Sequence, residues 1–143
     1  MNEPRDLQWQ IVLADEKRTR AIIARAFSSS QMNTTKWREL ADSLSGLAVK
    51  RWVKFVDVDY VQPVGEFWYS HKDWFDCGAF GPFSSVSIEY LEIARTEIQH
   101  RGALLAPVNV DHTDEIAKRL GAKAIPFEVY PDRIRVTGHV RKS

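Results

Sequence analysis

Four residues in one short segment carry side chains suited to nucleophilic chemistry or metal binding. His71, Asp73, Asp76 and Cys77 fall between positions 71 and 77. A nearby imidazole lowers the pKa of a thiol, so His71 and Cys77 are candidates for a nucleophilic pair. Imidazole, carboxylate and thiolate also ligate metals, but no known ligand spacing surrounds these residues, and ordinary loop polarity is the alternative. We therefore treat the four as candidate catalytic residues and expect neither a metal nor a cofactor.

Aromatic residues crowd the same part of the chain. The candidate binding residues among them are Trp68, Trp74, Phe75 and Phe80. Aromatic side chains bury large areas at little rotamer cost and are enriched at interface hot spots. Two interpretations stay open: the rings fill the core beneath a loop, or some of them form an exposed patch. The second predicts a protein partner or a homo-oligomer.

Composition narrows the classes of function. The chain has 143 residues, with 20 basic and 19 acidic side chains and a net charge of +1. A chain with so small a net charge exerts little electrostatic attraction on polyanions, so we expect no nucleic-acid partner. No apolar run approaches the roughly 20 residues that cross a bilayer, and the N-terminus lacks the pattern of a secretory signal. We therefore expect a cytoplasmic protein that does not enter a membrane.

The first third of the sequence predicts a strand followed by two helices. Apolar residues alternate over 7–13, which indicates a short strand. Asp15 is placed to cap a helix, and the serine-rich segment 28–31 reads as a linker. A second helix is expected to begin at Thr34 or Thr35, because apolar residues then recur at helical spacing.

The middle of the chain is rich in β-branched and aromatic residues, which predicts a strand within 49–61. Asp57 and Asp59 would then share one strand face as paired carboxylates, although plain solvation also explains that spacing. Residues 71–82 are expected to form a long irregular connection. Residues 86–94 favour a strand, and a helix opened by Ser84 or Ser85 is the alternative.

The C-terminal part predicts a short helix after residues 111–113 and a hairpin over 125–140, where apolar and basic residues alternate. These elements together indicate an α+β fold: a mostly antiparallel sheet with two or three helices packed on one side. The length suits a single domain spanning residues 1–143.

Several short motifs resemble those of a family of small uncharacterised bacterial proteins, a domain of unknown function. They are Asn33–Leu40, Ile88–Ile93, Arg101–Gly102, Ile125–Phe127 and Ile134–Gly138. The resemblance covers residues of about 32–143. It implies no reaction, so it assigns no catalytic residue.

Residues 1–31 lie outside this resemblance, and we expect them to form an accessory N-terminal extension, with Met32 as an alternative start. The sequence also lacks the glycine-rich, phosphate-loop and nucleophile-elbow motifs of common enzymes. The leading hypothesis is therefore a small protein-binding module, an immunity-type or regulatory partner of another bacterial protein. A small enzyme or metal-binding protein that uses His71, Asp73, Asp76 and Cys77 is the alternative.

Overall fold

The structure is a computed structural model that describes residues 4–71, 73–77 and 82–143, with the backbone alone for residues 4–14, 70 and 71. The helices are α1 (Pro4–Ala26), α2 (Thr34–Ser43) and α3 (Thr113–Ala122), with a 3₁₀ turn, η1, at Ser85–Ser87. The strands are β1 (Phe27–Ser30), β2 (Arg51–Phe55), β3 (Gln62–Val64), β4 (Trp68–His71), β5 (Trp74–Asp76), β6 (Phe83–Ser84), β7 (Ile88–Ala94), β8 (Thr96–Gln99), β9 (Val108–Asp111), β10 (Glu128–Val129), β11 (Arg133–Thr137) and β12 (His139–Arg141).

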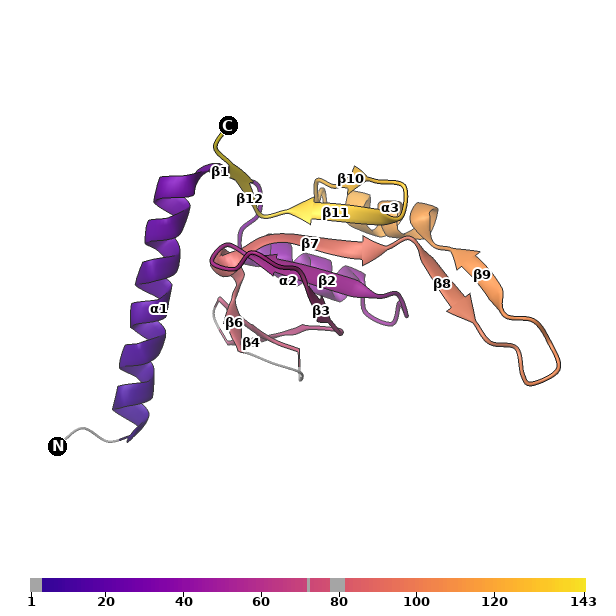
Figure 1. Cartoon of the computed structure of the whole chain (residues 1–143), viewed down its shortest axis with the longest axis horizontal. Coiled ribbons are helices and arrows are strands. Elements are labelled where there is room, and N and C mark those ends of the chain that lie inside the picture. The colour runs from indigo at the N-terminus through magenta and orange to yellow at the C-terminus, as the bar shows by residue number, and fades with distance from the viewer. Residues whose placement is uncertain (1–3, 72, 78–81) are drawn as a thin grey trace.

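The centre of the fold is a five-stranded sheet in the order β10-β11-β7-β2-β3. Every neighbouring pair in it is antiparallel. Helices α2 and α3 lie behind this sheet in Figure 1 and cover one of its faces. The prediction of an α+β fold with a mostly antiparallel sheet and helices packed on one side is confirmed.

The core lies between the sheet and these two helices. Asn33 caps α2, because its side chain accepts a hydrogen bond from the Lys36 N–H at 2.9 Å. The buried residues of α2 include Trp37 and Leu40, which are one helical turn apart. The buried side chains that meet them from the sheet and α3 are Val53, Leu91, Ile93, Ile116, Leu120, Ile134 and Val136. Each of the two helices therefore packs on the sheet through a single apolar stripe.

Three smaller units surround the central sheet. Strands β4, β5 and β6 form a three-stranded sheet, and β1 pairs with the C-terminal strand β12. Strands β8 and β9 form a hairpin that extends away from the body, opposite the end where α1 lies (Figure 1). The hairpin predicted within 125–140 corresponds to β10 and β11. Of the residues 86–94 predicted as a strand, 88–94 form β7, whereas 86 and 87 belong to the 3₁₀ turn η1.

Several predicted elements were wrong. Residues 7–13 belong to α1, so Asp15 lies inside a helix and does not cap one. Proline stands only at the first position of α1, where it favours helix initiation, and no glycine interrupts residues 4–26. Residues 28–30 are not a linker, since they pair with β12.

Two further expectations fail in the middle of the chain. Strand β2 ends at Phe55, so Asp57 and Asp59 lie in the following turn and do not share a strand face. Asp57 instead accepts a hydrogen bond from Arg18 Nη2 at 3.2 Å, which links α1 to the body. The expected irregular connection contains strand β5.

Candidate functional site

In Figure 1 no helix or strand of the described chain lies over the second face of the central sheet, the face opposite α2 and α3. Val53, Leu91 and Val136 point into the core, so their strand neighbours point the opposite way. The register places Glu92 of β7 opposite Trp52 of β2 and Arg135 of β11. We name this surface the arginine–aromatic face and define it by Trp52, Tyr90, Glu92, Arg133 and Arg135.

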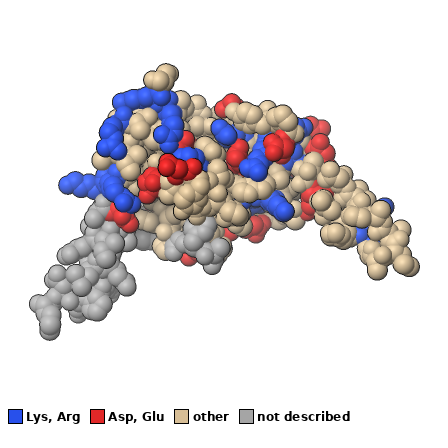
Figure 2. Space-filling view, in the orientation of Figure 1, with Lys and Arg blue, Asp and Glu red and all other residues tan. Residues whose placement is uncertain are grey.

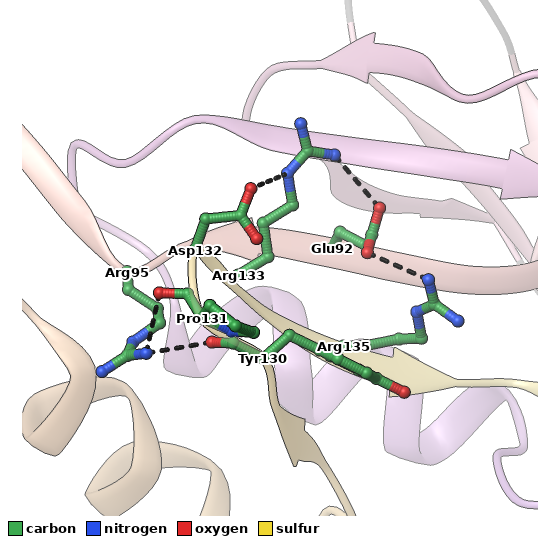
Figure 3. Close-up of polar contacts among 7 residues, drawn as sticks. All are labelled: Glu92, Arg95, Tyr130, Pro131, Asp132, Arg133 and Arg135. Atoms are coloured by element: carbon green, nitrogen blue, oxygen red, sulfur yellow. Dashed lines mark hydrogen bonds and ion pairs between the residues drawn. The ribbon is translucent and has the colours of Figure 1, made fainter.

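Glu92 lies between Arg133 and Arg135 on the arginine–aromatic face (Figure 3). Arg133 Nη1 donates to Glu92 Oε1 at 3.1 Å, and Arg135 Nη2 donates to Glu92 Oε2 at 3.2 Å. The Arg133 guanidinium lies 3.8 Å from the centre of a Trp52 ring, and that of Arg135 lies 4.1 Å from the Tyr90 ring centre. Ion pairs and cation–π contacts therefore fix both guanidinium groups in orientation.

Burial differs between the charges of this face. The Glu92 side chain is only 10% exposed, whereas those of Arg133 and Arg135 are 31% and 32% exposed. The cations therefore form the outer layer and the carboxylate lies beneath them. Exposed acids occur at the β10–β11 end, where Asp132 and Glu128 lie, and Figure 2 shows basic and acidic groups interspersed over this side of the molecule.

The β10–β11 turn is held by Arg95, which follows β7. Arg95 Nη1 donates to the carbonyl oxygens of Tyr130 and Pro131 at 2.9 and 3.0 Å (Figure 3). Its Nε donates to Thr113 Oγ1 at 2.8 Å, at the start of α3. One side chain therefore ties the turn to the helical layer and fixes the end of β11 that carries Arg133.

A second charged cluster continues the face toward β12. Glu89 accepts hydrogen bonds from Lys54 Nζ at 2.7 Å and from Arg141 Nε and Nη2 at 3.0 and 2.8 Å. Burial raises the pKa of Glu89, but the hydrogen bonds and charges of Arg141 and Lys54 lower it by more, so the pKa lies below its ordinary value. Burial also raises the pKa of Tyr90, so its phenol stays protonated at neutral pH.

The predicted catalytic residues lie along β4, β5 and their flanks. Asp73 accepts a hydrogen bond from Thr34 Oγ1 at 2.7 Å, Asp76 ends β5, and Cys77 is buried. His71 ends β4, and its side chain is outside the described part of the structure. No three His, Cys, Asp or Glu side chains that are described converge as metal ligands would. Catalysis or metal binding by these four residues stays a prediction.

The predicted binding residues occupy different environments. Trp68 is 51% exposed, and Trp74 is half-buried. Phe75 is fully buried and packs against Phe67 and Phe83, so its ring belongs to the core and is not available for direct contact with a partner. Phe80 lies outside the described residues. Binding through Trp68 or Trp74 stays a prediction.

Sequence reasoning missed the arginine–aromatic face as a unit. The alternation of Arg133 and Arg135 with apolar neighbours does signal that both point away from the core. The contribution of Trp52, Tyr90 and Glu92 depends on the pairing of β2 and β11 with β7, which no local pattern specifies.

The fold and this surface define a small α+β protein with one uncovered sheet face. A model of a family of unknown function (DUF6678) matches residues 19–143, and the chain belongs to that family. The match includes the last turns of α1 and all of β1. Comparisons with curated proteins and with solved structures found no match. No helix among the described residues is both long enough and apolar enough to span a bilayer.

Proposed function

We propose that this protein is a protein-binding module whose docking surface is the arginine–aromatic face. The observation that carries the proposal is an uncovered sheet face on which tryptophan, tyrosine and arginine side chains are held in fixed orientations. These three residue types dominate interface hot spots. Because Glu92 already orders both arginines, little side-chain entropy remains to be lost on binding.

The charge layering indicates the chemistry of the partner. Glu92 takes one N–H from each of Arg133 and Arg135, and a guanidinium has five N–H donors. Arg133 Nε lies 3.7 Å from Asp132 Oδ2 and Arg135 Nε is buried, so the remaining Nη N–H groups are the ones that suit a carboxylate. Trp52 and Tyr90 are half-buried, and the part of each ring that stays exposed offers apolar area. We therefore expect a protein partner that presents acidic side chains beside an apolar patch.

A protein fits this face better than a single-stranded nucleic acid does. Proteins that bind single strands on a sheet offer open aromatic faces on which bases stack. On this face the guanidinium groups of Arg133 and Arg135 cover ring faces of Trp52 and Tyr90. The near-neutral charge of the chain also supplies little attraction for a phosphate backbone.

An immunity-type or regulatory role toward another bacterial protein accords with this surface. Both roles need a small domain that recognises one protein. A second copy of the chain is the other occupant that the test below distinguishes.

The test compares affinity capture by three tagged proteins from a lysate of the native cells. They are the wild type, the double variant Arg133→Ala/Arg135→Ala, and the matched control Arg38→Ala. The control removes a guanidinium that lies 4.0 Å from the centre of the exposed Tyr69 ring, outside the arginine–aromatic face. Circular dichroism checks that all three proteins fold.

We expect a stoichiometric partner with the wild type and the control, and its loss with the double variant. The dissociation constant of the purified partner should rise at least about 30-fold in the double variant, as at a hot spot of about 2 kcal/mol. For the wild type, the dissociation constant should also rise with salt concentration, because the contact is ionic. Equal binding by the double variant, capture that nuclease abolishes, or capture of the chain alone would each contradict the proposal.

A further inference from the structure

A polar cavity of about 230 Å³ lies apart from the arginine–aromatic face, where β1 and β12 meet the start of α2 and η1. Its polar lining consists of Arg20, Ser30, Asn33, Thr34, Asp73, Ser85 and His139. Figure 1 shows β1 and β12 at the end of the molecule where α1 joins β1. The cavity thus gathers hydroxyl groups, a carboxylate and an imidazole at one place.

The imidazole of His139 is buried and fixed by three contacts. Its Nε2 lies 2.7 Å from the carbonyl oxygen of Val86, and a carbonyl can only accept, so Nε2 carries the proton. The ring also meets Phe27 edge-on, with 5.8 Å between the ring centres. In the neutral ring Nδ1 then has a free lone pair, and Ser30 Oγ lies 2.7 Å from it. Ser30 therefore donates its hydroxyl proton to an imidazole nitrogen.

The other hydroxyl groups of the cavity are placed differently. Thr34 Oγ1 donates to Asp73 Oδ1 at 2.7 Å, so Ser85 must donate in its 2.8 Å contact with Thr34. The hydroxyl protons of Thr34 and Ser85 are therefore both donated to oxygen atoms. Ser30 differs because its acceptor is a nitrogen base and because the residue is exposed to solvent. A base that accepts the proton of an accessible hydroxyl is the arrangement that activates a serine nucleophile.

We propose that Ser30 and His139 form a nucleophile–base pair that hydrolyses esters of short-chain acyl groups. The cavity volume sets the size of the acyl group, because pockets for larger ligands start at about 300 Å³. Asn33 and Thr34 bring the N-terminal end of α2 to the cavity wall, where N–H groups without intrahelical partners can stabilise an oxyanion. This activity is independent of the docking surface, since it uses none of the residues of that face.

The reaction proceeds in two balanced halves. Ser30 Oγ bonds to the carbonyl carbon of the ester while its proton passes to His139 Nδ1. The bond from that carbon to the alcohol oxygen then breaks, and the departing alcohol takes the proton from Nδ1. Water repeats the sequence on the acyl-serine, with His139 as the base, and releases the carboxylic acid and the free Ser30 hydroxyl.

The experiment measures labelling by a fluorophosphonate with a short alkyl chain, followed by intact mass and peptide mapping. In this probe reaction Ser30 Oγ bonds to phosphorus, fluoride leaves, and the proton is released through His139. We expect one adduct per chain, mapped to Ser30. Ser29→Ala is the matched control, because it removes an exposed hydroxyl from the same strand and should label like the wild type.

Ser30→Ala should not be labelled, and His139→Asn should be labelled about 100-fold more slowly, since asparagine offers a hydrogen bond but no base. The rate at which 4-nitrophenol is released from 4-nitrophenyl acetate should rank the proteins in the same way: wild type and Ser29→Ala fastest, His139→Asn slower, and Ser30→Ala inactive. Peptide mapping of the wild-type adduct needs no folded variant, so the test stands if His139→Asn does not fold. Absence of an adduct on the wild type, or an adduct on another residue, overturns the proposal.

Discussion

Replacing Gly138 by alanine should destabilise the fold, because the site has no room for a Cβ atom. Gly138 joins β11 to β12, and a Cβ there would lie 2.3 Å from the Ile88 carbonyl oxygen and 3.1 Å from a ring carbon of Trp37. The backbone is fixed on both sides, since the Gly138 N–H donates to Glu89 O at 2.7 Å and its carbonyl accepts from Gln31 N–H at 2.9 Å. The strands must therefore move apart to accept the methyl group.

The expected cost follows from these contacts. Overpacking of a dense site costs about 1–3 kcal/mol, and movement of backbone places this site near the upper part of that range. With a urea slope of about 2 kcal/mol/M, a loss of about 2 kcal/mol lowers the unfolding midpoint by about 1 M. Urea unfolding followed by tryptophan fluorescence measures this shift.

Gly121→Ala is the matched control for this prediction. Gly121 lies in α3, and a Cβ there meets nothing within 4 Å. Because alanine is the better helix former, the control should leave the midpoint unchanged or raise it, by up to about 1 kcal/mol in unfolding free energy. Equal midpoints for Gly138→Ala and the wild type would refute the steric reasoning.

Three further substitutions test the charged face and the extended hairpin. Because Glu89 has a pKa below its ordinary value of 4.5, its ionised form stabilises the fold above that pH, and this stability is lost as the pH falls through the lowered pKa. Urea midpoints from pH 7 to pH 3 should therefore fall less steeply for Glu89→Gln than for the wild type, and parallel curves would count against this linkage. Glu92→Gln should cost about 1–2 kcal/mol in urea unfolding, because it weakens charged hydrogen bonds to two arginines, and an unchanged midpoint would contradict that role. Leu104→Ser, at a 98% exposed position of the β8–β9 loop, should change the unfolding free energy by less than about 0.5 kcal/mol, and a larger loss would reveal an unrecognised packing role.

Local periodicity was sufficient for the elements whose apolar residues all face one core. The spacing of Trp37 and Leu40 predicted α2, and its buried residues are the expected ones. The alternation of Ile134 and Val136 with arginines predicted β11, and the pattern of residues 88–94 predicted β7. In α2 and β11 burial repeats at the period of the element, so the sequence pattern and the structure carry the same information. Burial in β7 has no such period, because Glu89 and Glu92 are buried as well as the apolar residues, and the strand was predicted from its apolar content.

The same method was wrong at the N-terminus. Apolar residues alternate over 7–13, yet α1 runs through them without a break, because no glycine or internal proline stops the helix. The serine-rich segment that follows has no apolar pattern. It becomes a strand because β12 supplies backbone partners for it.

The residue pattern was enough to predict the α+β class, helices α2 and α3, and the outward direction of the arginines on β11. It could not predict which side chains contact one another. Ser30 and His139 are 109 positions apart, and Glu92 lies 43 positions from Arg135. Periodicity reports whether a residue faces the core, whereas partners across strands depend on the register of pairing, which the whole core fixes at once.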